Sequence, residues 1–206
     1  MKHPLRERLP RGLVGDLSKY LVVFLFMTLT IGMISGFLVA DDSMLQAYDE
    51  SFEKYNIEDG NFTLAAEADD ALIDEIEKSD VTVCEHFYLE QKTEKGVDST
   101  LRIFKERDKV DLVCLMDGKM PASEDEIALD RMYAQNNDLA IGDAVTIGGT
   151  EYTISGLVAL SDYSALFSNN GDMMFDAVKF GVAIVTEDGF DSFDSDTIRY
   201  NYAWKY

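Results

Sequence analysis

A stretch of 21 residues without a charged side chain, from Tyr20 to Ala40, constrains this chain more than any other feature. With a rise of about 1.5 Å per residue, a helix of this length spans a hydrocarbon core of about 30 Å. A cleaved signal peptide is the alternative, but its apolar core has roughly 7 to 15 residues and precedes a small-x-small cleavage site. The large side chains of Phe37 and Leu38 stand where such a site needs small ones. We therefore expect an uncleaved transmembrane helix.

The charges on either side of this segment predict its direction. Five Lys and Arg residues and two acidic residues precede it, whereas Asp41 and Asp42 follow it directly. Basic flanks stay in the cytoplasm, so the chain is expected to cross the cell membrane once, with its N-terminus inside. The predicted regions are a cytoplasmic basic head at 1–19, a transmembrane helix at 20–40 and an extracytoplasmic domain at 41–206.

Within the membrane segment, Gly32 and Gly36 form a G-x-x-x-G spacing with Ser35 beside it. This spacing places small residues on one face of a helix and allows another helix to approach closely. Glycine is also common in membrane helices in general, so an incidental spacing is the alternative.

The outer region is strongly acidic. Of 18 basic and 39 acidic residues in the chain, 13 basic and 37 acidic residues follow Ala40. Such a surface repels nucleic acid, so we expect no nucleic-acid partner. A solvated acidic surface explains the composition without a specific cation-binding role. The two cysteines, Cys84 and Cys114, are compatible with one bridge between neighbouring strands or with two unpaired thiols.

Residue spacing predicts an α+β domain with a mainly antiparallel sheet and a few short helices. Helices are expected at 43–55, where the membrane helix continues outward, at 69–78, and at 130–136 between the caps Asp130 and Asn137. A hairpin is expected from 81–91 and 99–106. Further strands are expected at 61–65, 110–116, 126–129, 144–147, 151–159, 180–186 and 197–204.

The segment 161–175 mixes polar residues with large apolar ones. Its apolar and aromatic members are Tyr163, Leu166, Phe167, Met173, Met174 and Phe175. In an outer domain such a loop is a candidate contact for a partner or cargo. The alternative is a loop whose apolar side chains fold back onto their own core.

Two parts of the sequence resemble one known family. Residues 120–160 read MPASEDEIALDRMYAQNNDLAIGDAVTIGGTEYTISGLVAL, with Pro, Glu-Ile-Ala-Leu, Leu-x-Ile-Gly-Asp and Tyr-x-Ile-Ser-Gly-Leu in order. Residues 16–44 read DLSKYLVVFLFMTLTIGMISGFLVADDSM. Together they resemble the N-terminal membrane helix and extracytoplasmic core domain of MacB/FtsX-like permeases of ABC transporters.

The resemblance implies a membrane protein with several partners. In this family the outer domain is followed by three more membrane helices, and a cytoplasmic ABC ATPase subunit drives movement of the outer domains. This chain contains no later apolar segment of membrane length and no G-x-x-x-x-G-K-[ST] phosphate loop. The expected partners are therefore the ATPase, further permease helices or a second permease half, and the lipid bilayer.

No set of residues predicts catalysis. Cys84 and His86 share a strand face, but a zinc site needs about four ligands and the other histidine, His3, is expected inside the cell. The acidic stretch 124–126 and the pair Asp194 and Asp196 lack the spacing of a calcium loop. Ser155 lacks a G-x-S-x-G elbow. We expect no enzyme, no cofactor and no metal ligand.

The sequence leaves three candidate functions. The first is the N-terminal membrane component of an FtsX/MacB-like ABC permease whose outer domain relays ATP-driven motion or contacts cargo. The alternative is a stand-alone membrane-anchored protein that binds an extracytoplasmic ligand. An anchored hydrolase would have to depend on His86.

Overall fold

The computed structural model describes residues 16–94, 98–163, 165–169, 171–194 and 197–206. It divides into two compact units, Met1–Glu50 and Ser51–Tyr206. Most of the predicted basic head lies outside the described residues, because the description begins at Asp16. The boundaries predicted at 19, 40 and 206 stay predictions.

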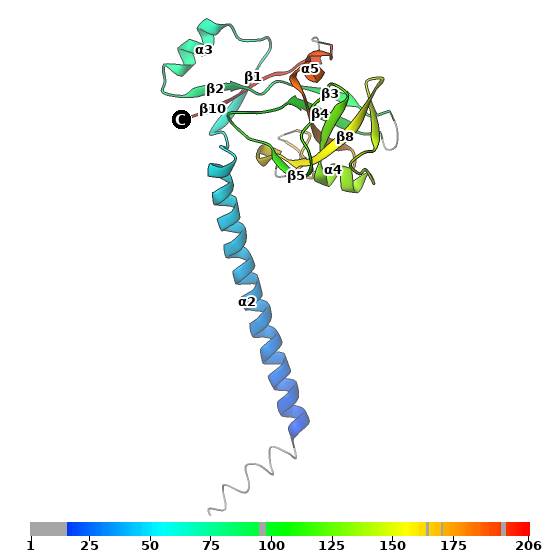
Figure 1. The fold of residues 1–206 in the computed structure, drawn as a ribbon. Helices are drawn as coiled ribbons and strands as arrows, with labels where there is room; N and C mark the ends of the chain where they lie inside the picture. Colours follow the sequence, from blue (N-terminus) through cyan, green and yellow to red (C-terminus); the bar gives the residue numbers. More distant parts are fainter. Residues whose placement is uncertain (1–15, 95–97, 164, 170, 195–196) are drawn as a thin grey trace, which may run out of the picture. The chain divides into compact units, whose positions relative to one another are not determined.

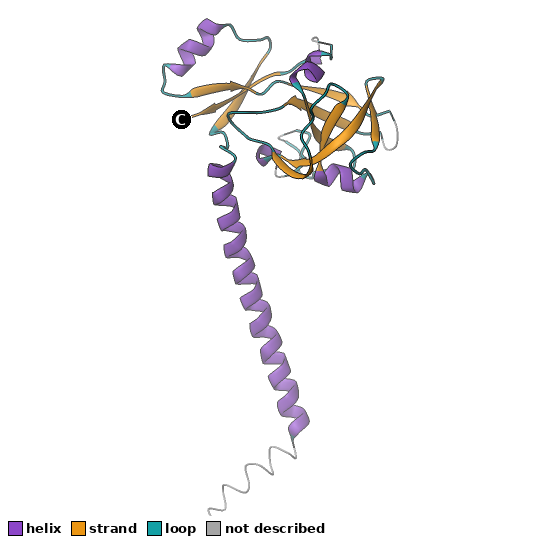
Figure 2. Cartoon of the chain, in the orientation of Figure 1, coloured by secondary structure: helices purple, strands orange, loops and turns teal. Residues whose placement is uncertain are grey.

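The first unit is dominated by α2 (Leu17–Lys54), a single helix of 38 residues (Figure 2). Its apolar part has a mean hydropathy of 2.3 and none of it is buried, so its length and composition suit a membrane span. The predicted segment 20–40 lies within it, and the helix continues past Ala40 to Lys54, over most of the 43–55 stretch that the sequence predicts as helix. Two side chains, Thr30 and Ser43, donate hydrogen bonds to carbonyls four residues back, which satisfies these hydroxyls inside the helix.

The second unit contains two sheets. The smaller is antiparallel, with β10 (Tyr200–Lys205) between β1 (Gly60–Leu64) and β2 (Thr82–Glu85). The strand that opens this unit therefore pairs with the last strand of the chain, with Gly60 opposite Trp204 (Figure 1). Both ends of the unit meet in this sheet.

The larger sheet has the strand order β3-β4-β9-β6-β8-β5, and β7 pairs with β8. The bounds are β3 (Tyr88–Lys92), β4 (Thr100–Lys105), β5 (Cys114–Gly118), β6 (Glu126–Asp130), β7 (Ala144–Ile147), β8 (Thr150–Ala159) and β9 (Phe180–Val185). The pairs β4–β9 and β6–β8 are parallel, so this sheet is mixed. Six of the eight strand pairings in the described residues are antiparallel, which confirms the predicted α+β class.

Short helices begin at polar caps. Asp69 accepts a hydrogen bond from the Leu72 amide at the start of α3 (Asp70–Glu77), and Asp130 caps α4 (Arg131–Asn136). Both helices were predicted. Two more, α5 (Glu187–Asp191) and the 3₁₀ turn η1 (Ser161–Tyr163), were not.

The core lies around β9, in which every residue is buried. This is the continuous apolar run expected of a central strand covered on both faces. A Cβ on Gly181 would lie 2.4 Å from the Tyr133 ring, so glycine is what lets α4 pack directly onto β9.

One predicted hairpin is wrong in part. β3 and β4 do pair as expected, but β2 belongs to the smaller sheet, where it pairs with β10. The chain passes from one sheet to the other at His86, whose amide donates to the Asn201 carbonyl, 2.8 Å away. A distant strand thus determines where the predicted 81–91 strand divides.

The strand predicted at 110–116 forms only from Cys114 onward. Asp111 has a φ of 50°, outside the extended region, and its amide donates to the Asn56 carbonyl. The Leu112 amide likewise donates to Tyr55. Contacts with the chain before β1 therefore replace sheet pairing here. Cys84 and Cys114 are both free thiols.

Candidate functional site

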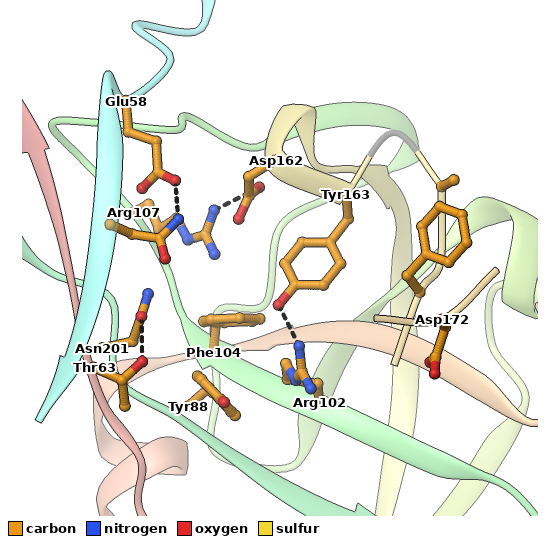
Figure 3. A pocket seen from close by; sticks show the side chains of 13 residues that line it. Glu58, Thr63, Tyr88, Arg102, Phe104, Arg107, Asp162, Tyr163, Asp172 and Asn201 are labelled. Carbon is orange, nitrogen blue, oxygen red and sulfur yellow. Dashed lines mark hydrogen bonds and ion pairs between the residues drawn. The ribbon is translucent and has the colours of Figure 1, made fainter. Parts of the chain in front are cut away.

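A polar cavity of about 460 Å³ lies between the two sheets of the second unit (Figure 3). Asn61 and Thr63 of β1 and Asn201 of β10 line it from the smaller sheet. Arg102 and Phe104 of β4 line it from the larger sheet. The loop between β8 and β9 covers another side, so this cavity has walls from three parts of the fold.

Arg102 attaches that loop to the sheet. Its Nη1 donates to the Tyr163 hydroxyl at 2.8 Å, and its Nη2 donates to the Ser168 carbonyl at 2.8 Å. It also pairs with Glu90 on the neighbouring strand. The guanidinium lies 4.6 Å from the centre of the Tyr88 ring, where a cation–π contact adds to the hydrogen bonds. One side chain therefore positions a large part of the cavity wall.

Arg107 is the most buried charge at the cavity, with 8% of the residue exposed. Its Nη1 lies 2.9 Å from Oδ1 of Asp162, and its guanidinium lies 4.4 Å from the centre of the Phe104 ring. Burial alone lowers the pKa of Arg107, but the Asp162 charge leaves it raised, so the side chain is cationic. Its Nε and Nη2 have no hydrogen-bond partner among the described residues. Two buried donors thus remain available for an acceptor.

The ionisable side chains of Glu58, His86 and Asp111 lie close to one another near Arg107. Burial raises the pKa of Glu58 to about 7, and the negative charges of Asp111 and Asp162 add to this, whereas a hydrogen bond from Asn61 opposes it. Burial and the Arg107 charge lower the pKa of His86 to about 4. Neutral histidine therefore lies among carboxyl groups at neutral pH.

The loop residues singled out from the sequence divide into two groups. Leu166 is 1% exposed and belongs to the core, while Tyr163 and Phe167 line the cavity. Met173 and Met174 are 97% and 85% exposed, and Phe175 lies edge-on to Phe167. Leu166 therefore packs into the core, whereas Met173 and Met174 are exposed to solvent. A contact with partner or cargo through this loop stays a prediction.

The small residues of the predicted membrane segment lie on α2 and do not line this cavity. A Cβ on Gly32 or Gly36 would meet nothing within 4 Å. Their role in helix packing, with Ser35, stays a prediction.

Sequence reasoning did not find Arg102, Arg107, Glu58 or Asp111 as site residues. In the sequence, Arg102 lies between the apolar Leu101 and Ile103 of a predicted strand, which places its side chain on the opposite face but does not indicate a site. The other three lie outside the strands, in segments that are brought together only by the tertiary fold.

Neither a protein-family model nor a curated protein matches the chain. Among solved structures, the chain is similar to the outer domains of ABC-type transporters. One is the extracellular domain of the noncanonic ABC-type transporter YknZ from Gram-positive bacteria, at 13% identity and a TM-score of 0.40, covering 70% of this chain and 73% of that one. Another is the periplasmic region of MacB from Actinobacillus actinomycetemcomitans, at 10% identity and a TM-score of 0.38, covering 66% of this chain and 63% of that one.

Proposed function

We propose that this chain is the N-terminal membrane component of an FtsX/MacB-like ABC transporter permease. In this account α2 anchors it, the N-terminus is cytoplasmic and residues 41–206 lie outside the membrane. The observation that carries the proposal is the order of parts. An exposed helix of 38 residues with a long apolar stretch precedes the domain, and residues 120–160, which resemble the family, contain the continuous unit β6–α4–β7–β8.

The residues behind the resemblance have identifiable structural roles in that unit. Gly142 has a φ of 94°, which favours glycine, and its amide donates to the Ile154 carbonyl. Asp143 accepts a hydrogen bond from the Ala140 amide at 2.8 Å and so closes the same turn. A Cβ on Gly156 would lie 2.4 Å from the Lys119 carbonyl oxygen. These residues build the unit, so the resemblance concerns the architecture of the domain.

The proposed role of the domain is to relay ATP-driven motion or to contact cargo. Because β1 and β10 pair, a pull on either end of the unit acts on the smaller sheet. The cavity has walls from both sheets, so a movement of one sheet against the other would change its shape. The exposed Met173 and Met174 supply an adaptable apolar surface for a partner or cargo.

Association with an ABC ATPase tests this proposal. The tagged full chain would be purified in mild detergent from the membranes that naturally contain it, and photolabelled with an azido derivative of ATP. We expect labelling of a co-purifying polypeptide whose sequence contains a G-x-x-x-x-G-K-[ST] loop, suppressed by excess ATP. A chain that purifies intact without any ATP-binding subunit would refute the permease proposal.

The cavity favours one alternative, a stand-alone membrane-anchored ligand-binding protein. Arg107 offers two buried unpaired donors there, a suitable anchor for a carboxylate or another anionic group. This alternative predicts ligand binding by the full chain in the absence of any ATPase. The permease proposal instead predicts that the ATPase changes the cavity, as seen in altered exchange of the loop after β8.

A further inference from the structure

Glu58, His86 and Asp111 come together from three separate segments of the second unit. One ligand atom from each lies within 4.8 Å of the other two. Glu58 follows α2, His86 connects β2 with β3, and Asp111 lies between β4 and β5. The arrangement brings one imidazole and two carboxylates to a single point.

Asp111 is fully buried and only partly satisfied. Its Oδ1 accepts a hydrogen bond from the Glu58 amide at 3.0 Å. Its Oδ2 accepts none from any part of the chain that the structure describes, and it lies 3.3 Å from Nδ1 of His86. Burying a carboxylate oxygen without a partner is costly, so the position calls for a proton or a cation.

The charges around this point leave a deficit of positive charge. Arg107 is the nearby cation, but its Nη1 is paired with the Asp162 carboxylate at 2.9 Å. That pair is neutral as a whole. Burial raises the pKa of both carboxyl groups in the empty site, and a bound divalent cation would displace their protons and balance the two negative charges of Glu58 and Asp111.

We propose that Glu58, His86 and Asp111 bind a divalent transition-metal cation, with Zn²⁺ as the ion that this donor set fits best. The inference is independent of the permease proposal. Imidazole nitrogen with carboxylate oxygen suits first-row transition metals, whereas Ca²⁺ takes six to eight oxygen ligands.

The geometry supports this ion. Zn²⁺ with bonds of about 2.1 Å separates two ligands in a tetrahedron by about 3.4 Å. The His86 and Asp111 atoms already lie 3.3 Å apart. Glu58 lines the cavity and is half-buried, so its side chain is the one that turns inward to complete the set. A fourth position remains for water or for a ligand in the cavity.

Zinc titration of the full chain tests the site directly. The protein in detergent, purified with a tag that lacks histidine and stripped with chelator, would be titrated with ZnCl₂ in a calorimeter. We expect one tight site per chain, and at least about tenfold weaker binding in Asp111→Asn, which removes the charge and keeps an acceptor for the Glu58 amide. Asn also tolerates the positive φ at this position.

Asp108→Asn is the matched control, since it removes an equal charge from an exposed position three residues away. It should bind Zn²⁺ as the wild type does, and His3→Asn should do the same. Co²⁺ substitution gives a second readout, a visible absorption band that His86→Gln abolishes. If circular dichroism shows that Asp111→Asn does not fold, Glu58→Gln takes its place in the Zn²⁺ titration. Equal Zn²⁺ binding by the wild type and by the folded site variants would overturn the proposal.

Discussion

The carboxylate oxygen Oδ1 of Asp162 lies 2.9 Å from Nη1 of Arg107 and joins the turn after β8 to the chain after β4. The Arg107 side chain is 4% exposed and that of Asp162 is 17% exposed. The pair therefore lies largely out of water, at the inner wall of the cavity (Figure 3).

Replacing Asp162 with Ala should destabilise the domain strongly. Removing one member of a buried ion pair leaves the other charge unpaired, at a cost of about 3 kcal/mol. The measurement is urea unfolding followed by fluorescence of Trp204, the one tryptophan of the chain. Asp172→Asn in the same loop should change the midpoint much less, because Asp172 is exposed and asparagine keeps an oxygen that accepts from Ser168 and Asn169. Equal midpoints for the two variants would show that the Arg107 pair contributes little.

Arg102→Ala should release the loop between β8 and β9. The substitution removes the hydrogen bonds to Tyr163 and Ser168 together, and each contributes about 1 kcal/mol. Amide hydrogen exchange of the loop should accelerate by about tenfold or more, with little change in β9. Arg102→Lys should rescue it only in part, because an ammonium cannot reproduce the forked geometry. Unchanged exchange in the alanine variant would contradict this role.

Gly181→Ala should weaken the packing of α4 on β9. The added Cβ would lie 2.4 Å from the Tyr133 ring, and overpacking of this kind costs about 1 to 3 kcal/mol. Gly171→Ala is the control, since a Cβ there meets nothing within 4 Å. Thermal unfolding should separate the two variants clearly. A melting temperature for Gly181→Ala equal to that of the control would mean that the Tyr133 ring moves to accommodate the added methyl group, and would contradict the prediction.

Leucine at Gly32 or Gly36 should disrupt packing of α2 against another membrane helix. Both positions are open in the structure, and a bulky side chain would keep a partner backbone at a distance. Energy transfer between labelled helices in bilayers is the measurement, with Ile34→Leu on another face as the control. The glycine variants should lose association and the control should keep it. If all three associate equally, the spacing is incidental.

Local signals in the sequence predict much of the fold. Asp69 and Asp130 stand at the N-terminal ends of the predicted helices and cap α3 and α4 in the structure. Gly142 has a positive φ in the turn before β7. Each of these features depends on neighbours within a few residues. The continuous apolar run of β9 similarly predicts a central strand.

Features that depend on distant partners were missed. The division of the predicted strand at His86 follows from pairing with β10, more than a hundred residues later in the chain. Asp111 adopts its positive φ against Asn56. The cluster of Glu58, His86 and Asp111 requires both arrangements at once, so no spacing within the sequence could reveal it.

The orientation of the chain in the membrane is the most direct test of its place as an anchored outer domain. In a background of Cys84→Ala and Cys114→Ser, single cysteines would replace Met173, which is 97% exposed, or Lys19, whose side chain is 79% exposed. A membrane-impermeant maleimide should label Met173→Cys on intact cells and Lys19→Cys only after permeabilisation. Labelling of Lys19→Cys on intact cells, with Met173→Cys protected, would contradict the account.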